Sequence, residues 1–308
     1  MVAPYQQGIS IQPLATAAIF YALAWHPNGG PIAIGGYKET RLIDPTTHKL
    51  IATLPNAADA VRALAFSRDG QLLAAAGGQP ARKGEIQIWN VSTRQLATTI
   101  GGHSDCVYAV AFSPDSATLA TASYDKLVKL WDARSGKEIR TLKDHIDAVY
   151  ALAFTPDGRR LVTGAADRSV KIWDTATGAR LYTLSDATDG INTVAISPDG
   201  RHIAAAGQDK TIRIWTLNEK DATLDRSLIA HEDAILKLAW SPDGKYLASA
   251  SADRSVKLFR ASDLTEVHTY PNLPDWPQGL DFSPNSQTLA AAIFNGDVKF
   301  YEVTDASQ

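Results

Sequence analysis

A histidine, a carboxylate and an indole recur at fixed spacing in the middle of the chain. His103 is followed 22 residues later by Asp125 and, after six more, by Trp131. With a hydroxyl between them, such residues could relay a proton in nucleophilic catalysis. The same two intervals begin again at His145 and end at Trp173. Because catalysis needs one exposed constellation, two equally spaced sets predict a structural unit that is copied along the chain.

Extending this register in both directions gives seven copies of the unit. Each copy has a bulky residue just before a turn of the Ser-Pro-Asp-Gly type, at intervals of 41, 46, 42, 42, 44 and 42 residues. These residues, which number the copies from one to seven, are Trp25, Phe66, Phe112, Phe154, Ile196, Trp240 and Phe282. Near-constant spacing leaves no room for a linker, so we expect residues 1–308 to form a single domain.

Each copy has the pattern of four short strands. In the third copy the apolar run 107–112 is followed by a Ser-Pro-Asp turn, the run 118–123 by a second turn, and strands are expected over 127–131 and 138–142. Strands that are apolar on both faces need cover on both sides, which a radial stack of small sheets supplies. The pattern therefore predicts an all-β fold built of four-stranded antiparallel sheets.

These motifs resemble the WD-repeat β-propeller family, and the resemblance extends over nearly the whole chain. The Trp-Asp pair occurs as Trp131-Asp132 and again at 173–174, and Gly102-His103 matches the Gly-His dipeptide of the family. The Ser-Pro-Asp-Gly turn occurs in full at 197–200 and 241–244. Seven copies in register imply a seven-bladed propeller, similar to WD-repeat domains that occur in bacteria.

The two ends of the chain are expected to meet in the last blade. Only seven residues follow Tyr301, the residue equivalent to Trp131, so the seventh copy has no room for a fourth strand. Residues 9–12 have the right offset before the first copy to supply it, and Pro13 is tolerable beside an outer strand. We therefore expect the N-terminal strand to complete the last blade and to close the ring.

In the resembled family, a His, a hydroxyl, an Asp and a Trp of one copy form a hydrogen-bonded chain. The resemblance implies this role for two sets: His103, Thr121, Asp125 and Trp131, and His145, Thr163, Asp167 and Trp173. Ser123 is a competing hydroxyl in the first set. Buried charge-assisted bonds contribute about 1.5–3 kcal/mol each, so the expected role is rigidity and no catalytic residue is predicted. The sixth copy has Phe259 where the Trp would donate, so its set is one link short.

Composition argues against several classes of protein. The net charge of −3 gives no general attraction to nucleic acid or acidic membranes, and no apolar stretch approaches the length of a membrane span. Residues 1–10 lack the charged start and apolar core of a secretory signal. The single Cys106 can form no internal disulfide, and no metal-ligand spacing or phosphate-binding motif stands out. We expect a cytoplasmic monomer without a metal or cofactor.

Function is therefore sought on the surface. In the resembled family, partners usually dock on the face that carries the loops entering the innermost strands and the turns between second and third strands, here called the top face. Five residues past the His position, the seven copies have Tyr21, Arg62, Tyr108, Tyr150, Asn192, Leu236 and Gln278. Tyrosines and an arginine near a channel mouth are typical of binding hot spots. Together with aromatic residues near the adjacent turns, the predicted partner-binding residues are Tyr21, Arg62, Tyr108, Tyr124, Tyr150, Trp276 and Phe294.

The leading hypothesis is a non-enzymatic scaffold that binds a protein or peptide partner on the top face, with an extended segment across the mouth of the central channel. Arg62 would pair with a carboxylate or phosphate of that partner. One alternative is a propeller enzyme of the hydrolase or lactonase type, which would need converging carboxylates or histidines that the ring of seven lacks. Another is a sensory module of a longer protein. Neither nucleic acid nor a membrane is an expected partner.

Overall fold

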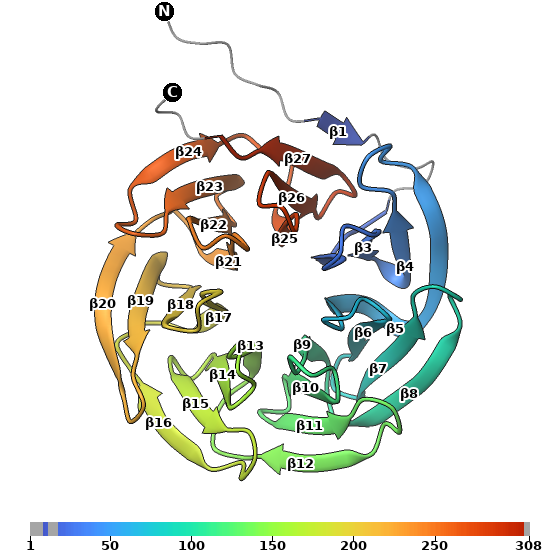
Figure 1. Cartoon of the computed structure of the whole chain (residues 1–308), viewed down its shortest axis with the longest axis horizontal. Coiled ribbons are helices and arrows are strands. Elements are labelled where there is room, and N and C mark those ends of the chain that lie inside the picture. Colours follow the sequence, from blue (N-terminus) through green and yellow to red (C-terminus); the bar gives the residue numbers. More distant parts are fainter. Residues whose placement is uncertain (1–8, 12–17, 305–308) are drawn as a thin grey trace, which may run out of the picture.

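The computed structural model describes residues 9–11 and 18–304. Within these residues every regular element is a β-strand, so the described chain contains no helix that could cross a membrane. The strands form six antiparallel sheets, which lie side by side around a common centre (Figure 1).

Copies three to six each form one four-stranded sheet, in which the chain runs from the innermost strand outward (Figure 1). The third copy contains β9 (Val107–Phe112), β10 (Thr118–Ser123), β11 (Val128–Asp132) and β12 (Glu138–Leu142). The fourth contains β13 (Val149–Phe154), β14 (Arg160–Ala165), β15 (Val170–Asp174) and β16 (Arg180–Leu184). The fifth contains β17 (Ile191–Ile196), β18 (His202–Gly207), β19 (Thr211–Leu217) and β20 (Ala222–Ile229). The sixth contains β21 (Ile235–Trp240), β22 (Tyr246–Ser251), β23 (Ser255–Arg260) and β24 (Glu266–Tyr270).

The first two copies share one seven-stranded sheet, which differs from the two separate sheets expected. Its strands are β2 (Ala22–Trp25), β3 (Ile32–Gly35), β4 (Tyr37–Ile43), β5 (Leu50–Phe66), β6 (Leu72–Gln79), β7 (Lys83–Asn90) and β8 (Leu96–His103). The 17-residue β5 pairs with β4 mainly through its first half and with β6 through its second half. The chain of the second copy stays extended at 56–59, whereas it bends at 104–105 in the third copy. One strand therefore serves both copies.

The last copy contributes three strands to its sheet, and a fourth comes from the start of the chain. The three are β25 (Pro277–Phe282), β26 (Thr288–Ile293) and β27 (Val298–Glu302). The short β1 (Ile9–Ile11) pairs with β27 in antiparallel register, with residue 9 opposite Phe300 and residue 11 opposite Val298. The strand was expected over 9–12, and residue 12 lies outside the described residues.

Innermost strands of consecutive copies contact each other around the centre. Contacts join β5 to β9, β9 to β13, β13 to β17, β17 to β21 and β21 to β25, and β2 touches both β5 and β25. A side chain also links β25 to β2, because Asp281 Oδ2 accepts a hydrogen bond from the backbone N–H of Trp25 at 2.7 Å. The first and last copies are thus in direct contact through their innermost strands.

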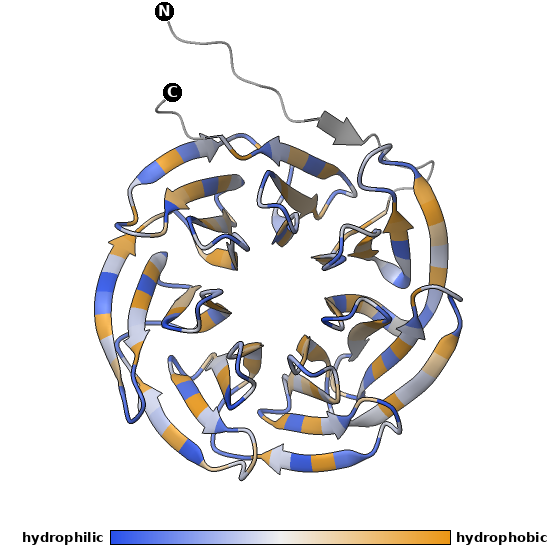
Figure 2. Cartoon of the chain, in the orientation of Figure 1, coloured by the Kyte–Doolittle hydropathy of each residue, from blue (hydrophilic) through white to orange (hydrophobic). Residues whose placement is uncertain are grey.

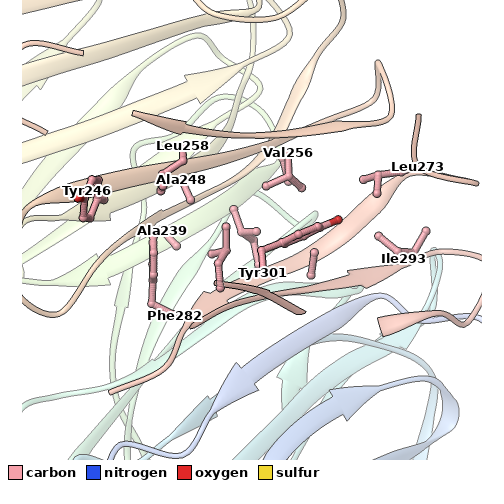
Figure 3. Packing of buried hydrophobic residues seen from close by; sticks show 13 residues of the cluster. Ala239, Tyr246, Ala248, Val256, Leu258, Leu273, Phe282, Ile293 and Tyr301 are labelled. Carbon is pink, nitrogen blue, oxygen red and sulfur yellow. The ribbon is translucent and has the colours of Figure 1, made fainter. Parts of the chain in front are cut away.

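The hydrophobic core lies between neighbouring sheets. Tyr301 and Phe282 of the seventh copy, for example, pack with Ala248, Val256 and Leu258 of the sixth (Figure 3). Second strands such as β10 and β18 are buried at nearly every position, whereas the outer β20 is mostly exposed and carries both hydrophobic and hydrophilic residues (Figure 2). Apolar runs therefore mark the inner strands, which are covered on both faces.

Candidate functional site

The His, hydroxyl, Asp and Trp of the third copy form one hydrogen-bonded chain. His103 Nδ1 lies 2.9 Å from Asp125 Oδ2, and His103 Nε2 lies 2.7 Å from Thr121 Oγ1. Trp131 Nε1 donates to the same Thr121 hydroxyl at 2.8 Å. Because an ionised carboxylate can only accept, the Nδ1–H of His103 donates to Asp125. In this tautomer Nε2 accepts from the Thr121 hydroxyl, which accepts in turn from the indole N–H. The competing Ser123 instead donates to the carbonyl oxygen of residue 105 at 3.1 Å.

The fourth copy repeats this geometry. His145 lies 2.8 Å from Asp167 Oδ2 through Nδ1 and 2.8 Å from Thr163 Oγ1 through Nε2. Trp173 Nε1 donates to Thr163 at 2.9 Å, and Ser169 adds a bond to Asp167 at 2.6 Å. Both predicted sets of four are therefore brought together by the structure.

In copies that lack one of the four residues, the remaining side chains are hydrogen-bonded differently. In the sixth copy His231 contacts Ser249 at 2.6 Å and Asp253 at 2.8 Å, with Phe259 in place of the indole donor. In the fifth copy Trp215 Nε1 donates instead to Asp186 Oδ2 at 2.9 Å. Sequence reasoning missed this substitute acceptor, which precedes the His-equivalent position by one residue.

Burial and electrostatics separate these sets from an active site. The side chains of His103 and Asp125 are only 0% and 5% exposed, so a substrate has no access to them. Burial alone would raise the pKa of Asp125, but hydrogen bonds from His103 and from the backbone N–H of Ser104 and Leu127 lower it overall. The pKa of Asp167 is lowered in the same way. The carboxylates thus stay ionised and hold the His in one orientation.

A cavity of about 250 Å³ opens where the innermost strands begin, and it collects one residue from each of the seven copies. It is lined by Tyr21, Arg62, Tyr108, Tyr150, Asn192, Leu236 and Gln278, together with Gln208 and Lys237. The first seven are the ring expected from the sequence, whereas Gln208 and Lys237 were not predicted.

A β-bulge explains why these side chains point toward the centre. In six innermost strands the pairing with the second strand skips one residue, and in each case that residue belongs to the ring: Arg62, Tyr108, Tyr150, Asn192, Leu236 and Gln278. A bulged residue leaves the ladder and its side chain is re-aimed. In β21 the bulge brings two consecutive side chains, Leu236 and Lys237, to the cavity. A lysine within the apolar run 235–240 was the signal that could have revealed it.

The seven predicted partner-binding residues are joined by ring contacts into one arc, here called the aromatic arc. Trp276 contacts Phe294 at 6.4 Å, and Phe294 contacts Tyr21 at 5.6 Å, both between ring centroids. The Arg62 guanidinium lies 5.5 Å from the ring of Tyr21 and 5.0 Å from that of Tyr108. Tyr108, Tyr124 and Tyr150 complete the arc with centroid distances of 5.1 to 6.4 Å.

Exposure varies along the aromatic arc. Tyr124 and Trp276 are each 48% exposed, whereas the remaining members are partly buried against one another. Burial raises the pKa of Tyr150 to about 12, so its hydroxyl stays protonated and can donate a hydrogen bond. The arc therefore offers apolar area with polar tips along one side of the cavity.

Larger cavities lie elsewhere but have a simpler origin. One of about 740 Å³ is lined by the Ser-Pro-Asp turn at 197–199, its counterpart near Asp243 and neighbouring residues such as Trp240. A cavity of about 500 Å³ is built from the equivalent turns of the third and fourth copies. Both grooves lie between equivalent turns of neighbouring copies and thus reflect the repeat, whereas the central cavity is lined by residues from all seven copies. No cluster of three or more His, Cys, Asp or Glu residues suited to a metal occurs within 9–11 and 18–304.

Two known protein-family models match parts of this chain. Residues 107–276, more than half of the chain, match the family model described as echinoderm microtubule-associated protein second beta-propeller. The chain belongs to this β-propeller family. Residues 5–133 match a second model, eukaryotic translation initiation factor eIF2A, and the two together indicate a WD40-like β-propeller. No curated protein matches the chain significantly.

Proposed function

We propose that this propeller is a non-enzymatic scaffold that binds a protein or peptide partner on its top face, across the mouth of the central channel. The observation that carries the proposal is the aromatic arc, in which Trp276, Phe294, Tyr21, Arg62 and the three tyrosines at 108, 124 and 150 touch in sequence. Tyr, Trp and Arg are the residues enriched at interface hot spots. The half-exposed Tyr124 and Trp276 at two separate places on the arc would anchor an extended segment.

The architecture proposed for this scaffold is a single WD-repeat domain over 1–308 with seven blades. Support comes from the seven sequence copies and from contacts that link their innermost strands in a cycle, ending with β25 beside β2. Pairing of β1 with β27 supports closure of the last blade by the N-terminal strand. Such closure would hold the arc rigid, because Tyr21 and Phe294 come from the first and last copies.

A binding role fits the lining of the cavity better than catalysis. Its nine lining residues include no Asp, Glu or His, so neither a carboxylate–histidine pair nor a set of such metal ligands converges there. The matched families are named for a microtubule-associated protein and a translation initiation factor, and propellers in such proteins commonly serve as interaction scaffolds. We accordingly propose partner binding in place of turnover.

Single substitutions on the arc test the proposal. Tyr108, Tyr150 and Trp276 are each changed to Ala, and Leu181, an exposed residue of the outer strand β16, is changed to Ala as the control. Partners captured from the source cell by each folded variant are compared with those of the wild type by quantitative mass spectrometry. The arc variants should lose the same partner at least tenfold while the control retains it. An unchanged set of partners in all three arc variants would contradict the assignment.

A further inference from the structure

Two cationic side chains, Arg62 and Lys237, line two neighbouring cavities of the channel. A second cavity of about 120 Å³ lies next to the first, and the two share only Arg62, Tyr108 and Lys237 among their lining residues. These three residues therefore form the boundary between the cavities. Arg62 and Tyr108 come from the adjacent strands β5 and β9, whereas Lys237 comes from β21 on the far side of the ring (Figure 1).

No acidic group neutralises this boundary. Neither cavity has an Asp or Glu in its lining, and the remainder of the second one is apolar, with residues such as Leu23, Val110 and Leu280. The acid nearest in sequence to Tyr108, Asp105, already accepts hydrogen bonds from the backbone N–H groups of residues 81 and 106. The channel thus presents positive charge in an apolar setting.

Both cations also have unused hydrogen-bonding capacity. The guanidinium of Arg62 is held between two tyrosine rings, and its buried Nε has no hydrogen-bond partner. The side chain of Lys237 is partly buried and forms no hydrogen bond or ion pair with any residue in 9–11 or 18–304, and burial lowers its pKa. An anion between the two cations would pair with both charges and could accept a hydrogen bond from the buried Nε of Arg62.

We propose that the partner of this scaffold inserts a carboxylate of an acidic peptide segment between Arg62 and Lys237. The inference rests on the proposed function and adds the chemistry of the group that enters the channel. A guanidinium binds a carboxylate through two parallel N–H hydrogen bonds. A lysine ammonium on the opposite wall adds a compact positive charge and an N–H donor. The amides of Asn192, Gln208 and Gln278 around the mouth can bind the peptide backbone.

Small probes test this chemistry independently of the natural partner. Isotope-labelled protein is titrated with N-acetyl-aspartamide and with N-acetyl-asparaginamide, its neutral counterpart, and binding is followed by the NMR shifts of channel residues. N-acetyl-triglycine and N-acetyl-triglycinamide form a second pair, which distinguishes a chain-end carboxylate from a side-chain carboxylate. Inorganic phosphate is titrated as the alternative anion. The variants are Lys237→Met, Lys237→Arg and, as a matched control, Lys220→Met at an exposed site.

At least one carboxylate probe should bind about tenfold more tightly than its neutral counterpart. Lys237→Met should weaken that binding at least tenfold, whereas Lys237→Arg and Lys220→Met retain it. Equal binding of the acid and neutral probes, no binding of any probe to folded protein, or unchanged binding by Lys237→Met would overturn the proposal. Phosphate binding tenfold tighter than every carboxylate would also overturn it. Loss of captured partners in the arc variants is measured separately, so either proposal can fail alone.

Discussion

Replacing Thr163 with Val removes the hydroxyl at the centre of a buried hydrogen-bonded set while keeping the shape of the side chain. Two buried groups then lose their partner, the indole N–H of Trp173 at 2.9 Å and the Nε2 of His145 at 2.8 Å. Each unsatisfied buried polar group costs about 1–3 kcal/mol, so the free energy of unfolding should fall by about 2–6 kcal/mol. The structural reason is that Thr163 is 0% exposed, so water cannot replace the lost hydroxyl.

The sixth copy supplies a natural control, because Phe259 occupies the position of the indole. Ser249→Ala leaves only the Nε2 of His231 without its partner at 2.6 Å, so the expected loss is about 1–3 kcal/mol. Thr163→Ser is a second control, which keeps the hydroxyl and removes one methyl group. Both comparisons change a fully buried position of a second strand, β14 or β22.

These differences are measured by urea unfolding of the wild type and the three variants, followed by circular dichroism. The slopes of the transitions are compared as well, since a shift of the midpoint at equal slope reports a change in the free energy of unfolding. Thr163→Val should be less stable than Ser249→Ala and less stable than Thr163→Ser. A loss in Thr163→Val no larger than that in Ser249→Ala would refute the account, because two unpaired groups would then cost no more than one.

Three further predictions concern pH and packing. The pKa of Asp167 is lowered on folding. The ionised carboxylate therefore stabilises the folded state above the unfolded pKa of about 4, and this stabilisation is lost as pH falls below that value. Asp167→Asn should flatten the acid side of a plot of the urea unfolding midpoint against pH. Burial raises the pKa of Asp281 to about 6. The contribution of this carboxyl to the free energy of unfolding is therefore fully present below about pH 4 and is lost as pH rises through 6. Asp281→Asn should abolish this loss of stability. A Cβ at Gly207 would lie 1.9 Å from the carbonyl oxygen of Gly190, so Gly207→Ala should cost about 1–3 kcal/mol in urea unfolding, whereas Gly101→Ala, with no atom within 4 Å, should be nearly neutral.

The spacing predicted a repeated unit, and the resemblance to the WD-repeat family implied that its His, hydroxyl, Asp and Trp are hydrogen-bonded to one another. Fixed intervals between His103, Asp125 and Trp131 placed these residues in equivalent positions of a repeated hairpin, and the structure joins them through Thr121. Thr121 is the hydroxyl that the resemblance implied, and the structure shows what the competing Ser123 does instead, which is to donate to the carbonyl oxygen of residue 105.

Other features depend on geometry that no local pattern encodes. The bulge in β21 turns both Leu236 and Lys237 to the channel, although alternation along a strand would place them on opposite faces. The continuous β5 joins two copies because its middle stays extended, a difference visible only in the hydrogen-bond ladder. The acceptor role of Asp186 likewise follows from the path of a loop.

Site-specific photocrosslinking tests the central claim, that the top face binds the partner, most directly. A photoreactive benzoylphenylalanine is placed at position 124 or 276 on the aromatic arc, or at position 181 on an outer strand, where Leu181 is 44% exposed and thus comparably accessible. Covalent adducts formed in the source cell are then compared by gel mobility and mass spectrometry. We predict that one partner crosslinks from positions 124 and 276 and not from 181. Crosslinking from 181 with none from the two arc positions would contradict the account.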